Sequence, residues 1–125
     1  SRDWGYAKDY IEGMWLMMQY DYPEDWVLAT GVTKTVRDFA EEAFKYVNLN
    51  WEDYVITSEK YFRPNEVNYL LGDSSKAREV LKWKPSVDFK GLVKIMVEYD
   101  INEAKKDFTL LKDNLISPTW EYPKL

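Results

Sequence analysis

The 125-residue chain contains no cysteine and no histidine. The absence of cysteine excludes disulfides, thiolate catalysis and zinc sites built on cysteine. The absence of histidine removes the side chain best suited to proton transfer near neutral pH and the commonest ligand of transition metals. Nucleophilic catalysis would therefore have to use serine or threonine with lysine, or a carboxylate.

Long apolar runs and glycine-rich turns are also missing. No apolar run approaches the roughly 20 residues that cross a bilayer, and the N-terminus lacks the basic and then apolar layout of a signal peptide. The five glycines are scattered, and none forms the GxGxxG or GxxxxGK pattern that cradles phosphates. We expect a soluble cytoplasmic protein that does not enter a membrane.

Positive charge is in the minority. The net charge of -5 and the pI near 4.8 argue against sequence-independent binding to a polyanion, so nucleic acid is not an expected partner. Net charge does not exclude a local positive pocket, because Arg2, Arg63 and Lys60 could converge while the acidic residues face water.

Apolar residues are plentiful: 46% of the chain is hydrophobic and 17% aromatic, which is enough for one compact core. Their periodicity predicts an α+β arrangement of about four helices and two or three short strands, in a domain over 1–107 followed by an irregular extension over 108–125. Strands this short rarely form a sheet alone, and the chain begins at Ser1 and not at methionine. We therefore expect a piece of a longer protein. The predicted helices are 7–20, 36–47, 74–81 and 89–111, and the predicted extended segments are 26–30, 54–57 and 67–71.

Local signals place the helix ends and faces. Thr35 followed by Asp38 resembles a capping box, and Asp73 can cap the third helix. The first helix carries a broad apolar stripe, which predicts that this face is buried. The stripe consists of Tyr10, Ile11, Met14, Trp15, Met17 and Met18.

No catalytic constellation is visible. Ser74, Ser75 and Lys76 lie at a helix start, where a cap and a solvated lysine explain them better than a nucleophile with its base. The adjacent pairs Glu41–Glu42 and Glu24–Asp25 are interpreted as solubilising surface charges.

The segment YFRPNEV carries the better binding signal. The planar fork of Arg63 suits a diphosphate, the following proline stiffens the loop, and Glu66 could accept hydrogen bonds from sugar hydroxyls. The alternative from spacing alone is an internal ion pair between Arg63 and Glu66 that shapes the loop.

Three motifs occur in a fixed order: RDWGxAKDY at the N-terminus, RPxEV around Arg63, and GDxxKA before the third helix. With the surrounding stretches WVLATGVTKTVRDFAEEAFKYV and FKGLVKIMVEYD, they resemble the C-terminal part of the GDP-mannose 4,6-dehydratases, within the extended short-chain dehydrogenase/reductase family. The resemblance covers about residues 2–101.

The resemblance implies a longer enzyme. Members of this family have an N-terminal Rossmann domain that binds NADP and carries the Thr/Ser, Glu and Tyr-x-x-x-Lys catalytic set. This chain has no Tyr-x-x-x-Lys, so the resemblance implies the substrate-binding part of a lyase whose catalytic residues and Rossmann domain lie outside these 125 residues. The activity implied is conversion of GDP-mannose to GDP-4-keto-6-deoxymannose, a step toward GDP-fucose, by a homo-oligomeric full chain; the fragment alone is expected to be inactive.

The resemblance also assigns binding roles. Arg2 and Arg63 would contact the diphosphate of the GDP-sugar from two sides, and Glu66 would accept hydrogen bonds from the ribose. One departure concerns Lys82, where relatives usually have glycine, so the third helix must end without a glycine to adopt the left-handed conformation.

Two alternatives differ in class from an enzyme part. One is a stand-alone module, without catalysis, that binds a nucleotide-sugar or a protein. The other is an unrelated helical domain in which Arg2 and Arg63 form surface ion pairs.

Overall fold

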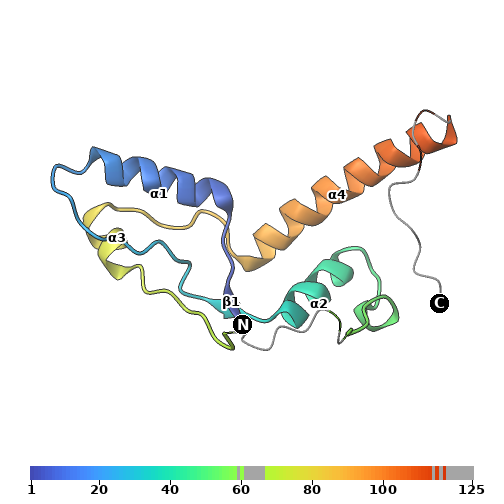
Figure 1. The fold of residues 1–125 in the computed structure, drawn as a ribbon, viewed down its shortest axis with the longest axis horizontal. Coiled ribbons are helices and arrows are strands. Elements are labelled where there is room, and N and C mark those ends of the chain that lie inside the picture. The colour runs from blue at the N-terminus through green and yellow to red at the C-terminus, as the bar shows by residue number, and fades with distance from the viewer. Residues whose placement is uncertain (59, 61–66, 114, 116, 118–125) are drawn as a thin grey trace. The chain divides into compact units, whose positions relative to one another are not determined.

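The computed structural model describes residues 1–58, 60, 67–113, 115 and 117. These residues form four α-helices, a 3-10 turn and two short strands (Figure 1), so the predicted α+β class is confirmed. The chain divides into two compact units, Ser1–Lys94 and Ile95–Leu125. In chain order the elements are β1 (Arg2–Asp3), α1 (Ala7–Gln19), β2 (Thr33–Lys34), α2 (Val36–Tyr46), η1 (Trp51–Asp53), α3 (Ser75–Val80) and α4 (Phe89–Lys112).

The helices begin where local sequence signals place them. At α2, the Thr35 hydroxyl accepts a hydrogen bond from the Asp38 backbone N–H at 2.9 Å, and the Asp38 carboxylate accepts one from the Thr35 N–H at 2.7 Å. The predicted capping box is therefore confirmed. At α3, the Asp73 carboxylate accepts from the Ser75 N–H at 2.9 Å, although Ser74 is the N-cap residue.

The predicted strands are wrong. Residues 26–30 and 54–57 form no strand, and the only described ladder is the antiparallel pair of β1 and β2, with Arg2 opposite Lys34 and Asp3 opposite Thr33. Residues 67–71 also form no strand, although the Leu70 N–H donates to the Ser1 carbonyl at 3.2 Å. A strand needs a neighbour for its backbone groups, and no ladder partner for 26–30 lies within the described residues.

The core of the first unit gathers around Trp83. Its side chain is 2% exposed, and its indole N–H donates to the Asp9 carbonyl at 2.8 Å. A Cβ added at Gly13 of α1 would lie 3.0 Å from the Trp83 ring nitrogen, so glycine lets α1 approach the tryptophan closely. The other buried apolar residues are Ala29, Ala77, Leu92 and Val93.

A buried carboxylate joins α1 to the segment before α4, which runs along that helix in Figure 1. Asp9 is 4% exposed and accepts hydrogen bonds from the Ser86 hydroxyl at 2.5 Å, the Ser86 N–H at 3.0 Å and the Val87 N–H at 3.3 Å. These three donors replace the water that burial removes from the charged group.

The apolar stripe of α1 is not a buried face as predicted. Ile11 is 63% exposed and Met18 81% exposed, and Met14 and Trp15 are also exposed. The helix turns Asp9 and Gly13 toward the core instead. Tyr10 and Met17 are half-buried, so the exposed part of the stripe consists of Ile11, Met14, Trp15 and Met18. Exposed apolar surfaces of this kind occur at protein contacts, membrane contacts and ligand grooves.

The end of α3 adopts the left-handed conformation without a glycine. Lys82 has φ of 57°, and the following Trp83 N–H donates to the Ala77 carbonyl at 3.3 Å. Lysine at position 82, where relatives usually have glycine, therefore strains the backbone.

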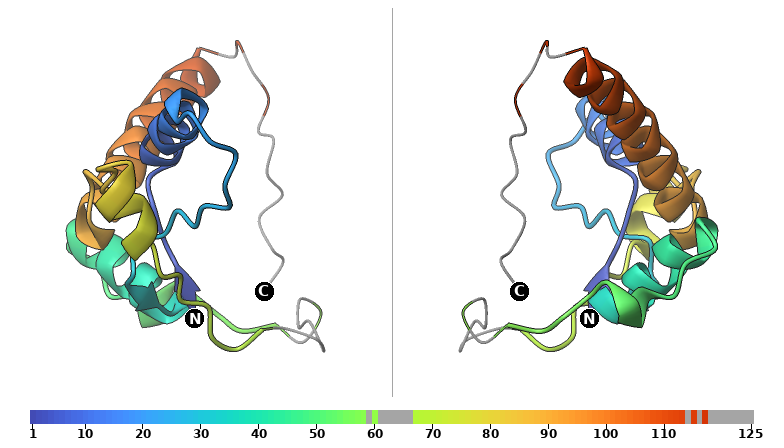
Figure 2. Two further views of the ribbon diagram at one scale, coloured as in Figure 1. Left: turned by 90° about the vertical axis from the view of Figure 1, so that its left-hand side faces the viewer. Right: turned by 90° about the vertical axis from the view of Figure 1, so that its right-hand side faces the viewer.

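The second unit contains the distal turns of α4, which run as one continuous helix to Lys112 (Figure 2). Here Lys106 pairs with Glu103 across one turn at 2.5 Å. No helix within the described residues combines the length and apolar character that a bilayer crossing requires.

Candidate functional site

Arg2, the first predicted binding residue, lies in β1. Its guanidinium donates hydrogen bonds to the Ser1 carbonyl at 2.8 Å and the Val67 carbonyl at 2.7 Å, and the Ser1 ammonium donates to the Asn68 carbonyl at 2.6 Å. The N-terminal strand thus lies beside the chain that follows Glu66 in sequence. Arg63 and Glu66, the other two predicted binding residues, lie outside the described residues.

Asp3, the neighbour of Arg2 in β1, holds this strand in place through its side chain. Its carboxylate accepts hydrogen bonds from the Thr30 hydroxyl at 2.5 Å, the Thr30 N–H at 2.8 Å, the Gly31 N–H at 3.0 Å and the Gly72 N–H at 3.3 Å. Burial raises the pKa of Asp3, but these hydrogen bonds outweigh burial and hold the pKa below its ordinary value. No local pattern in the sequence marks this role, because the donors are 27 to 69 residues away.

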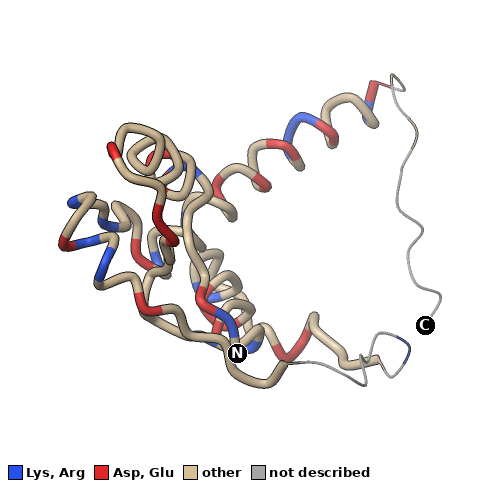
Figure 3. The backbone as a smooth tube through the Cα atoms, turned by 60° about the vertical axis from the view of Figure 1, so that its left-hand side comes forward, with Lys and Arg blue, Asp and Glu red and all other residues tan. Residues whose placement is uncertain are grey.

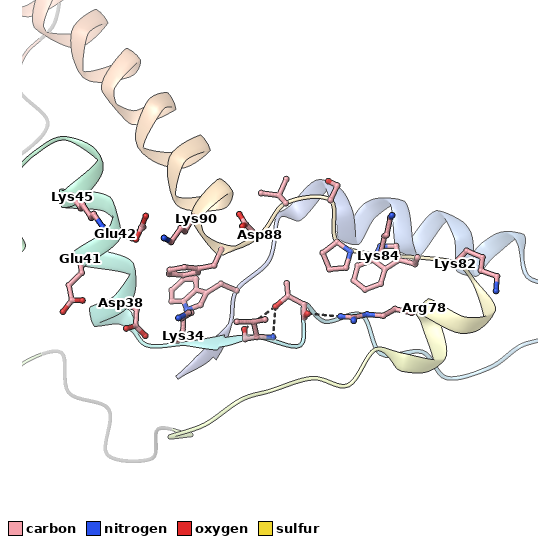
Figure 4. A pocket seen from close by; sticks show the side chains of 18 residues that line it. Lys34, Asp38, Glu41, Glu42, Lys45, Arg78, Lys82, Lys84, Asp88 and Lys90 are labelled. Atoms are coloured by element: carbon pink, nitrogen blue, oxygen red, sulfur yellow. Dashed lines mark hydrogen bonds between the residues drawn. The ribbon is translucent and has the colours of Figure 1, made fainter.

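A separate groove of about 1070 Å³ lies between α2 and the segment leading into α4 (Figure 4). Six lysine or arginine side chains and four carboxylates line it. Trp4 contributes to its wall, donates its indole N–H to the Lys34 carbonyl at 3.0 Å and packs on Phe39 with ring centroids 5.0 Å apart. Arg2 is not among the residues that line the groove, although its ladder partner Lys34 is.

The candidate nucleophile region at the start of α3 is structural. Ser74 is 3% exposed and its hydroxyl donates to the Ala29 carbonyl at 2.8 Å. Lys76 pairs with Glu24 at 2.5 Å and lies 4.6 Å from the centre of the Trp26 ring. Serine and lysine are therefore engaged separately and do not form a nucleophile with its base.

Metal ligation finds no support in the part of the chain that the structure describes. No group of three or more carboxylates lies close enough there to hold a metal ion. The chemistry that Arg2 could bring to this region is anion binding, because a guanidinium presents a planar fork of N–H donors.

Comparisons with known proteins agree on one family. The family model described as GDP-mannose 4,6 dehydratase matches residues 1–96. GDP-mannose 4,6 dehydratase 1 of Arabidopsis thaliana is 53% identical over 110 residues, which cover 88% of this chain and 30% of the relative. The human GDP-mannose 4,6 dehydratase is 44% identical, covering 81% of this chain and 32% of the relative. The enzyme of Sinorhizobium fredii is 42% identical, with 82% and 34% covered.

The chain spans about a third of the length of the curated relatives it matches. The matched region contains the RDW motif with Arg2 and the hydrogen-bonded contact of Arg2 with Val67. The chain belongs to the GDP-mannose 4,6-dehydratase family.

Proposed function

We propose that these 125 residues are the substrate-binding part of a cytoplasmic, homo-oligomeric lyase of the extended short-chain dehydrogenase/reductase family. The enzyme would convert GDP-mannose to GDP-4-keto-6-deoxymannose. The family match over residues 1–96 carries this proposal. On this account the 125 residues bind the nucleotide-sugar and have no turnover by themselves.

The proposed site is a diphosphate clamp. Arg2 would bind the diphosphate from one side and Arg63 from the other, and Glu66 would accept hydrogen bonds from ribose hydroxyls. The contact of Arg2 with the Val67 carbonyl at 2.7 Å supports the arrangement, because Val67 directly follows Glu66. Two arginine forks on one diphosphate would balance its charge and fix its orientation.

NADP does not fit the residues of this chain. A dinucleotide site of the Rossmann type needs a glycine-rich turn between a parallel strand and a helix. The sheet within the described residues is a two-stranded antiparallel pair, and the chain contains no GxGxxG. We therefore assign NADP binding to a part of the enzyme outside these residues.

The apolar stripe of α1 supports the same division. Ile11, Met14, Trp15 and Met18 are exposed, and the relatives extend over roughly three times the matched length. We propose that the catalytic part of the enzyme packs on this face of α1. This supports the enzyme reading over the stand-alone module, because an isolated module would leave the stripe in water.

A chimera tests the proposed function. The matching region of the Arabidopsis GDP-mannose 4,6 dehydratase 1 is replaced by this chain, and turnover of GDP-mannose is followed with NADP present. We expect activity from the chimera and none from the 125 residues alone. A folded chimera that binds NADP but does not turn over GDP-mannose would contradict the proposal, and so would turnover by the isolated chain.

A further inference from the structure

The distal half of α4 carries a regular apolar stripe that lies beyond the region matched by the family model, which ends at residue 96. Its members follow one another at alternating steps of four and three residues, the spacing of a two-helix seam. They are Val97, Ile101, Ala104, Phe108 and Leu111.

This stripe is open to solvent. Phe108 is 71% exposed, Ala104 is exposed, and Val97, Ile101 and Leu111 are partly exposed. Between Asp100 and Lys112, Leu110 is the only apolar residue outside the stripe. A helix of this length depends on packing of its apolar face for stability in water, so the stripe needs a partner.

The charges beside the stripe select that partner. Asp100 and Asp107 flank it on one side, and Glu98, Lys105 and Lys112 flank it on the other; the acidic and basic positions along α4 are coloured in Figure 3. In a parallel pair of helices in register, a residue on the first side faces the residue five positions later on the other chain. Each Asp100 would then face Lys105 of the second copy, and each Asp107 would face Lys112.

The opposite orientation is disfavoured. In an antiparallel pair, each side of the stripe faces the same side of the other helix. Asp100 and Asp107 would then face aspartates and Lys105 would face lysine; the one favourable pairing, Glu98 with Lys112, is outnumbered. Like charges at flanking positions destabilise a helix pair, and opposite charges set its orientation. The other described ion pair of this segment, Lys106 with Glu103, lies away from the stripe and does not compete.

We propose that the distal half of α4 pairs with the same segment of a second copy of this chain, as a short parallel coiled coil in register. The seam holds little more than two heptads, so the contact is weak on its own. It adds to the contacts of a larger assembly and holds two copies with their α4 helices parallel.

Charge reversal tests the pairing with a second copy. Sedimentation equilibrium of the 125-residue chain, from about 10 μM to about 1 mM, measures the dimer fraction. The variant D100K/D107K and the variant K105E/K112E each place like charges across the seam, so each dissociates at least roughly tenfold more readily than the unchanged chain. Mixed together they restore all four pairings, and the mixture forms heterodimers. The control E103K/K106E, off the seam, leaves the dimer fraction unchanged.

Disulfide crosslinking tests whether the two helices are parallel. Because the chain has no cysteine, an introduced cysteine is its only thiol. Ala104 lies on the seam and meets its own copy in the proposed pair, so A104C forms an intermolecular disulfide under mild oxidation, whereas N102C on the outer face does not. A chain that stays monomeric at every concentration overturns the proposal. A dimer that ignores both charge reversals, or that fails to crosslink through A104C, overturns it as well.

Discussion

The guanidinium of Arg2 lies 2.7 Å from the carbonyl oxygen of Val67, across 65 positions of sequence. This hydrogen bond brings the RDW motif at the N-terminus beside Val67, the last residue of the RPxEV motif. Ser1 also contacts Asn68 and Leu70, so the N-terminal stretch lies beside residues 67–70.

Asp3 is predicted to be the main support of that N-terminal strand. Asp3→Ala leaves the N–H groups of Thr30, Gly31 and Gly72 without their acceptor, and we expect it to lower the free energy of unfolding by about 1–3 kcal/mol. Urea unfolding followed by tryptophan fluorescence measures the loss. Asp21→Ala, at an exposed position, should change stability by less than about 0.5 kcal/mol; equal losses in both variants would contradict the assignment.

Stability is predicted to fall in acid. The hydrogen bonds to Asp3 hold its pKa below its value in the unfolded chain, so its stabilisation is present above the unfolded pKa and is lost as the pH falls through the folded pKa. The pKa values of Asp38 and Asp73 are also lowered, by hydrogen bonds from Thr35 and Ser75. Unfolding free energies from pH about 6 down to about 2 should decrease less steeply for Asp3→Asn than for the unchanged chain. Parallel curves would rule out this role of Asp3.

Asp9 and Ser86 are predicted to be coupled. The Asp9 carboxylate is buried and accepts a hydrogen bond from the Ser86 hydroxyl. We therefore expect Asp9→Ala to lower the free energy of unfolding by about 3 kcal/mol and Ser86→Ala to lower it by about 1 kcal/mol. The double mutant should lose less stability than the two single mutants added together, by a coupling energy of at least about 0.5 kcal/mol. A double-mutant cycle by thermal or urea unfolding measures this, with the exposed Glu12→Ala as the control. Additive losses would show that the two side chains act independently.

Lys82→Gly is predicted to stabilise the chain. Lys82 holds a φ of 57°, a conformation that costs a residue with a Cβ about 1–2 kcal/mol and costs glycine little. Part of that gain is offset by the greater freedom of glycine in the unfolded chain, so we expect a net gain of about 0.5–1 kcal/mol. The same change at Lys84, which is not in the left-handed region, should not stabilise. Equal effects at the two positions would contradict the explanation.

The capping box of α2 gives a fifth stability prediction. Thr35→Ala removes the acceptor of the Asp38 N–H and should cost about 0.5–2 kcal/mol, whereas Thr35→Ser keeps the hydroxyl and should cost less. Differential scanning calorimetry of the two variants makes the comparison. If serine were as damaging as alanine, the loss would come from the threonine methyl group and not from the cap.

Features encoded within a few residues could be predicted from the sequence. The cap of α2 depends on Thr35 and Asp38, three positions apart, and the strained end of α3 on the missing glycine at Lys82. The apolar periodicity located α1 and α4 for the same reason, since residues three and four positions apart lie on one face of a helix.

Features that depend on distant partners could not be predicted. Asp9 receives its hydrogen bonds from residues 77 and 78 positions away, and no spacing in the sequence marks it. Residues 26–30 have the composition of a strand, but a strand also needs a neighbouring chain, and β1 and β2 are too short to show a period. The stripe of α1 was located correctly, but periodicity cannot say whether the covering surface belongs to these residues.

The most direct measurement of the central claim is the Michaelis constant for GDP-mannose in the active chimera carrying Arg2→Ala. Loss of a charged hydrogen-bonding contact of about 1.5–3 kcal/mol should raise this constant roughly 10- to 100-fold. Arg2→Lys keeps the charge without the planar fork, so its Michaelis constant should lie between those of the unchanged chimera and Arg2→Ala. Arg37→Ala, on the exposed face of α2, should leave the constant unchanged. A stable Arg2→Ala chimera with an unaltered Michaelis constant would contradict the assignment of Arg2 to the nucleotide-sugar site.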